Sequence, residues 1–247
     1  MTIQPNTVPG MGVRRLTLKD QLPDCEIFID QPIYSTTEIC RGKKVVDIGC
    51  GYGRNRSIVE GVGGTWTGVE PFEGGAHTVV ADAENLPFAN GSFDVAIMDA
   101  VLEHIPDASK AFSEVARILK PGGCFIGYVA FMECFHEISY SHLSFKALEH
   151  FSNKYGLKLE KISGGHRFGL DYHKMVLMYP LPVRWIRPIR AFLIRRTFRL
   201  KSRLAYVGLR MKRKMNHADA KKMARDYFKL ECLRQSVGFN FLIRKPQ

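Results

Sequence analysis

The chain has 247 residues and a mass of 28.0 kDa, enough for one α/β domain whose core needs no disulfide or metal support. Hydrophobic residues make up 45% and charged residues 24%, which excludes wholesale disorder and collagen-like or coiled-coil architectures. The opening segment has no apolar core of the signal-peptide kind, and the longest apolar stretch, residues 175–183, is short and interrupted by proline. We therefore expect neither a signal peptide nor a membrane span.

Charge is distributed unevenly along the chain, although the whole carries +12. Residues 1–130 hold 11 Lys or Arg and 16 Asp or Glu, whereas residues 131–247 hold 25 and 8. The C-terminal part is therefore expected to face an anionic partner such as nucleic acid, phospholipid headgroups or an acidic substrate. The six cysteines show no zinc or disulfide spacing, which favours reduced thiols in a cytoplasmic protein.

The order of elements indicates a doubly wound parallel sheet, because short β-branched runs alternate with longer amphipathic stretches between residues 43 and 129. Strands are predicted at 43–48, 65–70, 78–81, 93–99, 124–130, 157–162 and 238–244. Helices are predicted at 54–62, around 102–104, at 109–119 and at 145–155.

About seventy residues separate the last two predicted strands, too many for a plain loop inside a compact domain. We therefore expect an inserted helical element or a lid there. The predicted organisation is an N-terminal cap segment at 1–42, a cofactor domain at 43–164 plus 236–247, and a basic helical insertion or lid at 165–235.

The most informative segment is VVDIGCGYGRN, residues 45–55, in which a hydrophobic strand runs into three alternate glycines and then a helix. Glycine lets the backbone turn sharply and approach a ligand, and the following helix start presents N–H groups to polar or anionic atoms. Position 54 is Arg rather than the third glycine of the dinucleotide pattern, and no GK[ST] follows. Both an NAD site and a triphosphate site are thereby disfavoured.

Carboxylates follow at the ends of the next three predicted strands. Glu70 lies where an acid can accept hydrogen bonds from both ribose hydroxyls of a nucleoside. Asp82 can accept from an adenine amine, and the small Ala83 leaves space for the ring. Asp99 lies on the same carboxyl edge, where doubly wound sheets bind ligands. Singly, each acid could instead be a solvated strand-end residue, and Asp99 could cap a helix.

Together these segments resemble a class I S-adenosylmethionine-dependent methyltransferase of the small-molecule, type 11-like kind. The matching pieces are VVDIGCGYG, Glu70, ADAENLPFANGSFD, AIMDAVLEHIPD and ILKPGG, in the family's order over residues 43–130. The resemblance implies a Rossmann-like, doubly wound seven-stranded sheet with an antiparallel last strand. The basic helical insertion before that strand is predicted from the length and charge of the segment. The resemblance also implies S-adenosyl-L-methionine as cofactor, bound by Asp47, Gly49, Cys50, Gly51, Gly53, Glu70, Asp82, Ala83 and Asp99.

Catalytic candidates are sought among side chains near the methyl group that could accept a proton. A base is needed only when the acceptor is a hydroxyl, a phenol or an activated carbon. His104 follows the fourth predicted strand, and the loop after the fifth carries Glu133 and His136. Each of these could instead be ordinary loop packing. The loop fits no metal-ligand spacing, so no metal site is predicted.

Residues 184–225 contain 15 Lys or Arg and a single acid, Asp219, with apolar residues interleaved at near-helical spacing. This pattern predicts a basic amphipathic helix or helix pair. We expect peripheral contact with an anionic membrane, at the inner surface of the cytoplasmic membrane, ahead of nucleic acid. A solvated basic face over ordinary packing is the alternative.

The expected reaction is methyl transfer from S-adenosylmethionine to a small or lipid-linked acceptor, at oxygen rather than nitrogen or carbon. An RNA or protein methyltransferase is the rival enzyme. The alternative that is not an enzyme is a scaffold protein that binds the cofactor but does not catalyse methyl transfer.

Overall fold

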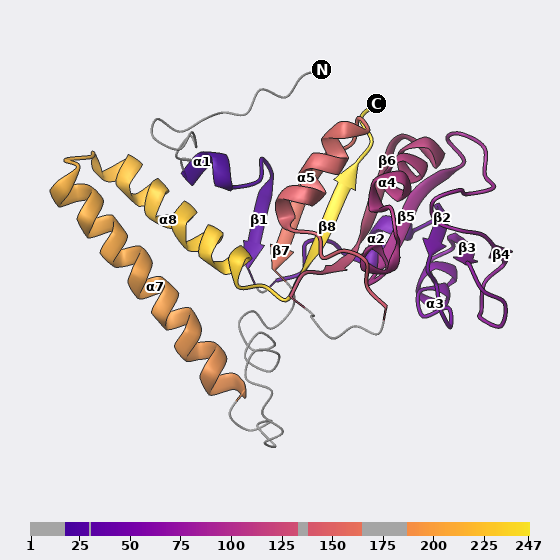
Figure 1. Cartoon of the computed structure of the whole chain (residues 1–247), viewed down its shortest axis with the longest axis horizontal. Helices are drawn as coiled ribbons and strands as arrows, with labels where there is room; N and C mark the ends of the chain where they lie inside the picture. The colour runs from indigo at the N-terminus through magenta and orange to yellow at the C-terminus, as the bar shows by residue number, and fades with distance from the viewer. Residues whose placement is uncertain (1–17, 30, 133–137, 165–186) are drawn as a thin grey trace.

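Figure 1 shows the computed structural model, which describes residues 18–29, 31–132, 138–164 and 187–247. The described strands are β1 (Glu26–Ile29), β2 (Lys44–Ile48), β3 (Thr65–Glu70), β4 (Val79–Val80), β5 (Phe93–Asp99), β6 (Leu119–Ala130), β7 (Lys158–Gly164) and β8 (Gly238–Arg244). They form one sheet in the order β1-β7-β8-β6-β5-β2-β3-β4. Strand β8 runs antiparallel to β6 and β7, and the other paired strands are parallel.

The Rossmann-like class is confirmed, as is the antiparallel last strand, but the sheet has eight strands where seven were predicted. The additional strand is β1, which pairs in parallel with β7 from Glu26↔Lys161 to Ile29↔Gly164. Its four residues are too few to show a clear alternation, and its place at the edge depends on β7, more than a hundred residues later in the chain. Such a nonlocal pairing leaves little trace in local sequence.

Helices cover both faces of the sheet. Successive side chains of β2 point to opposite sides, so that Val46 and Ile48 pack under α4 and α5 while Val45 packs under α2 and α3. Side-chain oxygens of Asp107 and Ser144 accept from backbone N–H groups in the first turns of α4 and α5. The described helices are α1 (Leu18–Gln21), α2 (Thr36–Cys40), α3 (Arg56–Glu60), the 3-10 helix η1 (Leu102–His104), α4 (Ala108–Ile118), α5 (Phe145–Lys154), α7 (Arg187–Lys212) and α8 (His217–Arg234).

The long helices α7 and α8 form a hairpin beside β1, at the opposite end of the sheet from β4 (Figure 1). The Ser202 hydroxyl donates to the Ala224 carbonyl at 2.6 Å, and Phe198 packs with Cys232, Phe228 and Ile29. Five strand spacings of about 4.8 Å, or about 24 Å, separate β1 from β2. The described part of the predicted insertion thus lies beside the far edge of the sheet and not over the glycine loop.

Candidate cofactor and active site

The glycine loop, residues 49–53, turns at the carboxyl end of β2, between the ends of β3 and β5. The Gly49 N–H donates to the Val69 carbonyl at 2.9 Å, and Gly49 has a φ of +71°. A Cβ built on Gly49 would lie 2.4 Å from a methyl carbon of Val101. Because this contact is too close for any side chain, glycine is what allows the end of β2 to meet the segment after β5.

Gly51 joins the loop to β3, because its N–H donates to a carboxylate oxygen of Glu70. Its φ of +52° lies in the left-handed region that favours glycine. A Cβ on Gly51 would have no protein atom within 4 Å, so the space above this residue is open. A backbone without a side chain, facing open space beside a carboxylate, fits an adenosyl ligand that needs close approach and a ribose acceptor.

Glu70 and Asp82 lie on neighbouring strand tips. Glu70 pairs with Val80 across β3 and β4, and its carbonyl accepts from the Ala81 N–H at 2.9 Å. Asp82 follows directly and is exposed, with Oδ1 accepting from the Glu84 N–H at 2.8 Å. The side chain of Ala83, in contrast, belongs to the hydrophobic core. The two carboxylates therefore lie at neighbouring strand ends on the carboxyl edge of the sheet, at the candidate cofactor crevice, and Ala83 is buried next to Asp82.

Arg54 and Asp99 form an ion pair that joins the end of the glycine loop to the end of β5. Both side chains remain partly exposed, so the pair contributes little to stability and its charges stay accessible. Ala100, the next residue, has a φ of +59°, a strained conformation that is concentrated at functional sites. The sequence predicted Asp99 at this edge but not its partner; the basic residue directly after the third glycine was the available signal.

Asp47 is buried beneath the glycine loop rather than open to the crevice. Its carboxylate accepts from Trp66 Nε1 at 3.1 Å and from Asn55 Nδ2 at 3.2 Å. Burial raises the pKa of Asp47 to about 6 despite these hydrogen bonds. Cys50 is also buried, and burial raises the pKa of its thiol to about 11. Cys50 packs in the hydrophobic cluster that includes Cys40 of α2 and Val59 of α3.

His104 stands in η1, close to the loop that follows the described end of β6. Its Nδ1 is in hydrogen-bond contact with the Ile138 carbonyl, and the Tyr140 N–H donates to the Glu103 carbonyl at 2.8 Å. A carbonyl can only accept, so Nδ1 is the donor in this contact. The other two catalytic candidates, Glu133 and His136, lie outside the described residues.

The structure therefore brings the predicted cofactor residues to one edge of the sheet, around Gly51. Gly49, Gly53, Glu70, Asp82 and Asp99 surround it on the ends of β2, β3, β4 and β5. Asp47, Cys50 and Ala83 are buried behind them.

Comparison with known proteins identifies the kind of domain. Residues 46–127 match the family model of the methyltransferase domain. Residues 46–127 thus belong to a class I S-adenosylmethionine-dependent methyltransferase domain. S-adenosylmethionine is its cofactor, and the matched residues include the glycine loop, Glu70, Asp82 and Asp99.

Curated relatives of the methyltransferase domain cover only part of the chain. An uncharacterized methyltransferase of Mycobacterium sp. (strain JLS) is 29% identical over 147 residues, which is 53% of this chain and 58% of that protein. A ubiquinone biosynthesis O-methyltransferase of Thiobacillus denitrificans is 34% identical over 97 residues, 33% of this chain and 42% of the relative. A sterol 4-C-methyltransferase of Caenorhabditis elegans is 33% identical over 107 residues, 37% of this chain and 32% of the relative.

A solved structure extends the similarity in fold over most of the chain. A Bacillus halodurans protein assigned to the methyltransferases has a TM-score of 0.51 at 13% identity, covering 86% of this chain and 97% of its own. At this identity the similarity concerns the fold alone.

Proposed function

We propose that this protein transfers the methyl group of S-adenosylmethionine to an oxygen of a small, hydrophobic or lipid-linked acceptor. The observation that carries the proposal is the contact between the Gly51 N–H and the Glu70 carboxylate, next to Asp82 on the adjoining strand. This arrangement would supply a ribose acceptor, an adenine acceptor and an open backbone at one edge of the sheet.

Different residues of the chain would bind different parts of the cofactor. With one Glu70 oxygen accepting from Gly51, the other can accept from the ribose diol. Asp82 Oδ1 already accepts from Glu84, which orients Oδ2 for the adenine amine. The Arg54 guanidinium, paired with Asp99, can turn to the cofactor carboxylate at the methionine end.

The bound cofactor supplies an electrophilic sulfonium methyl, so the protein mainly has to orient the acceptor and exclude water. In this proposal His104 Nε2 takes the proton from an acceptor hydroxyl, and the contact of Nδ1 with the Ile138 carbonyl supports the tautomer that this role needs. An oxygen acceptor is the case in which this base would matter most.

The surface next to His104 supports a hydrophobic acceptor. Ile138 is 65% exposed and Tyr140 is 61% exposed, and hydrogen bonds tie their loop to η1. Exposed apolar side chains beside a polar centre are typical of substrate-binding walls. Relatives named for ubiquinone and sterol methylation also support an apolar acceptor.

Incubation of the full chain with methyl-labelled S-adenosylmethionine and lysate fractions tests this function. We expect label in the lipid-extractable fraction in an ether or ester linkage. His104→Gln should lower transfer about 100-fold because the base is lost, while affinity for S-adenosylhomocysteine changes less than twofold. Label confined to RNA or protein would contradict the proposed acceptor. Tight cofactor binding without label in any fraction would favour a non-catalytic scaffold.

A further inference from the structure

The helix α7 carries an exposed apolar stripe on the side that faces away from α8. Its members are spaced by seven, four, three and four residues, which places them on one side of a 3.6-residue helix. All are among the large hydrophobic side chains that the fold leaves exposed, from 46% for Val207 to 74% for Met211. The apolar stripe consists of Leu193, Leu200, Leu204, Val207 and Met211.

Cationic side chains flank the apolar stripe. Arg196, Arg203 and Arg210 repeat every seven residues along one side of it, and Lys201 lies on the other side. The sequence of α7 contains nine Lys or Arg and no Asp or Glu. Within the ranges that the structure describes, no ion pair connects a carboxylate to these four cations.

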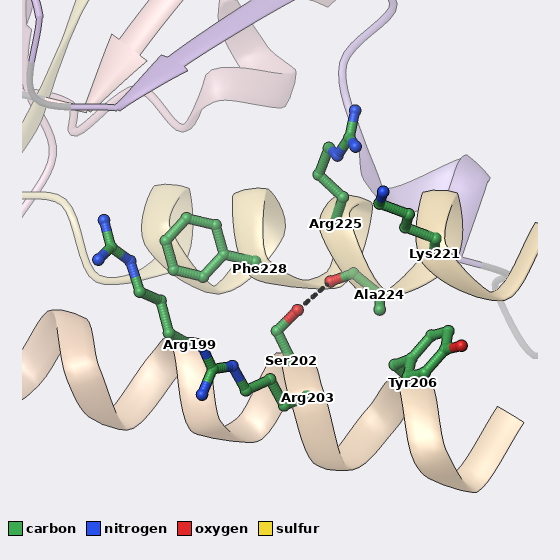
Figure 2. A pocket seen from close by; sticks show the side chains of 8 residues that line it. All are labelled: Arg199, Ser202, Arg203, Tyr206, Lys221, Ala224, Arg225 and Phe228. Atoms are coloured by element: carbon green, nitrogen blue, oxygen red, sulfur yellow. Dashed lines mark hydrogen bonds between the residues drawn. The ribbon is translucent and has the colours of Figure 1, made fainter. Parts of the chain in front are cut away.

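The row of arginines continues into a groove of about 390 Å³ between α7 and α8. Figure 2 shows Arg199 and Arg203 on α7, with Lys221 and Arg225 on α8. Among the lining residues, the Ser202 hydroxyl on α7 donates to the Ala224 carbonyl on α8 and so connects the two helices. The four cations that line the groove lie beside the apolar stripe. The surface of the hairpin therefore has a positively charged strip next to an apolar strip.

We propose that the α7 face of the hairpin docks on an anionic phospholipid bilayer, with the apolar stripe at the acyl boundary and the flanking cations among the phosphates. An interfacial helix has this arrangement, since long cationic side chains reach the headgroups while the apolar side chains enter the boundary. No described helix meets the length and hydropathy of a membrane span, so the contact would be peripheral.

Charge and side-chain type favour a bilayer over RNA as the occupant. The basic groove alone would suit either phosphate source. The stripe contains only Leu, Val and Met, whose side chains cannot stack on bases as aromatic rings do; the exposed ring of Phe192 and the groove residues Tyr206 and Phe228 lie outside it. An RNA ligand would leave this apolar surface in water, whereas a bilayer would cover it.

Vesicle flotation of the full chain tests the proposal without any cofactor or substrate. The vesicles are phosphatidylcholine alone or with 30% phosphatidylglycerol, each at low and high salt. We expect binding to anionic vesicles at low salt, weakened at high salt, and at least 30-fold weaker binding to neutral vesicles. Equal binding to both vesicle types would overturn the proposal.

Paired variants identify the docking face. Arg196→Gln with Arg203→Gln should weaken binding to anionic vesicles about 30-fold. Leu200→Ser with Leu204→Ser should weaken it about tenfold or more. The matched control, Arg41→Gln with Lys43→Gln, removes the same charge from exposed positions next to the start of β2, five strand positions from β1, and should bind as wild type does.

Circular dichroism and binding of S-adenosylhomocysteine show whether each variant is folded, and neither readout depends on the membrane. Folded α7 variants that still bind like the wild type would contradict the assignment of this face. A 30-nucleotide RNA bound by the hairpin cations, with no flotation at low salt, would also contradict it and would assign the groove to nucleic acid.

Discussion

At the scale of single residues, the candidate crevice depends on two features of Gly51: the absence of a side chain and the position of its backbone N–H. It lacks a Cβ where the space is open, and it offers an N–H that fixes the Glu70 carboxylate. Many glycines adopt positive φ in this fold, so conformation alone does not mark a ligand site. The combination with an open, carboxylate-lined space distinguishes Gly51.

Gly51→Ala can be compared with Gly63→Ala, because both glycines have positive φ and neither Cβ would meet an atom within 4 Å. Each substitution should cost about 1 kcal/mol of unfolding free energy, since alanine disfavours the left-handed region. Urea unfolding measures this. Only Gly51→Ala should weaken S-adenosylhomocysteine binding, by about tenfold or more, as its methyl enters the crevice. Equal affinities for the two variants would contradict the placement of the ligand.

Asp47 predicts a specific pH dependence. Its pKa is raised to about 6 in the folded protein, so the folded state binds more protons than the unfolded state between pH 4 and 6. The contribution of Asp47 to the free energy of unfolding therefore falls as pH rises from 4 to 6. Relative to wild type, Asp47→Asn should gain up to about 3 kcal/mol of unfolding free energy between pH 4 and 6.5.

Glu114→Gln provides the control of opposite sign. The Arg117 hydrogen bond lowers the pKa of Glu114, so this group stabilises the folded state above its unfolded pKa and loses that contribution as pH falls. The variant should lose stability relative to wild type as pH rises. Urea titrations at several pH values measure both differences; a flat profile for Asp47→Asn would rule out the buried, proton-binding carboxyl.

At the scale of elements, long periodic segments and glycine-terminated strands could be predicted, whereas short elements held by distant partners could not. The helix at 109–119 was predicted from its apolar spacing and is α4, Ala108–Ile118. Helix α2 has only five residues, with Ser35 capping it, and forms where Cys40 is buried against the sheet. The insertion was predicted as a helix or a helix pair, and the break before Asn216, the α8 cap, makes it a pair.

The hairpin should depend on Phe198, which anchors α7 to α8 and β1. Phe198→Ala should weaken this docking by about 3 kcal/mol. Trypsin cleavage within 187–212 should then accelerate about 100-fold, because local opening exposes the basic helix. Phe192→Ala, at a 58% exposed position, is the control and should leave the rate unchanged. Equal cleavage rates in both variants would show that Phe198 does not hold the hairpin.

At the scale of the whole molecule, the two predicted interaction surfaces lie at opposite ends of the sheet. The candidate cofactor site lies at the ends of β2, β3, β4 and β5, and the basic hairpin lies beside β1 (Figure 1). This arrangement matches the charge division between an acidic first half and a basic second half. A protein docked through the hairpin would keep its crevice open along the carboxyl edge.

The cofactor site was more predictable than the catalytic site for a physical reason. Glycines and acids at strand ends have fixed relations to a parallel sheet, so Gly51, Glu70 and Asp82 could be placed together from sequence. The contact of His104 with Ile138 depends on how a later loop folds back on η1, and that is set by tertiary packing. Burial of Asp47 under the glycine loop was likewise not visible in the strand pattern.

Calorimetric titration of S-adenosylhomocysteine into wild type, Glu70→Ala and Glu73→Ala tests the central claim most directly. Glu73 is an exposed acid three residues later, in the loop that follows β3, and serves as the matched control. We predict binding by wild type and by Glu73→Ala, and at least about 100-fold weaker binding by Glu70→Ala, because two charge-assisted hydrogen bonds to the ribose are lost. Absence of binding by wild type, or equal affinity for Glu70→Ala, would contradict the account.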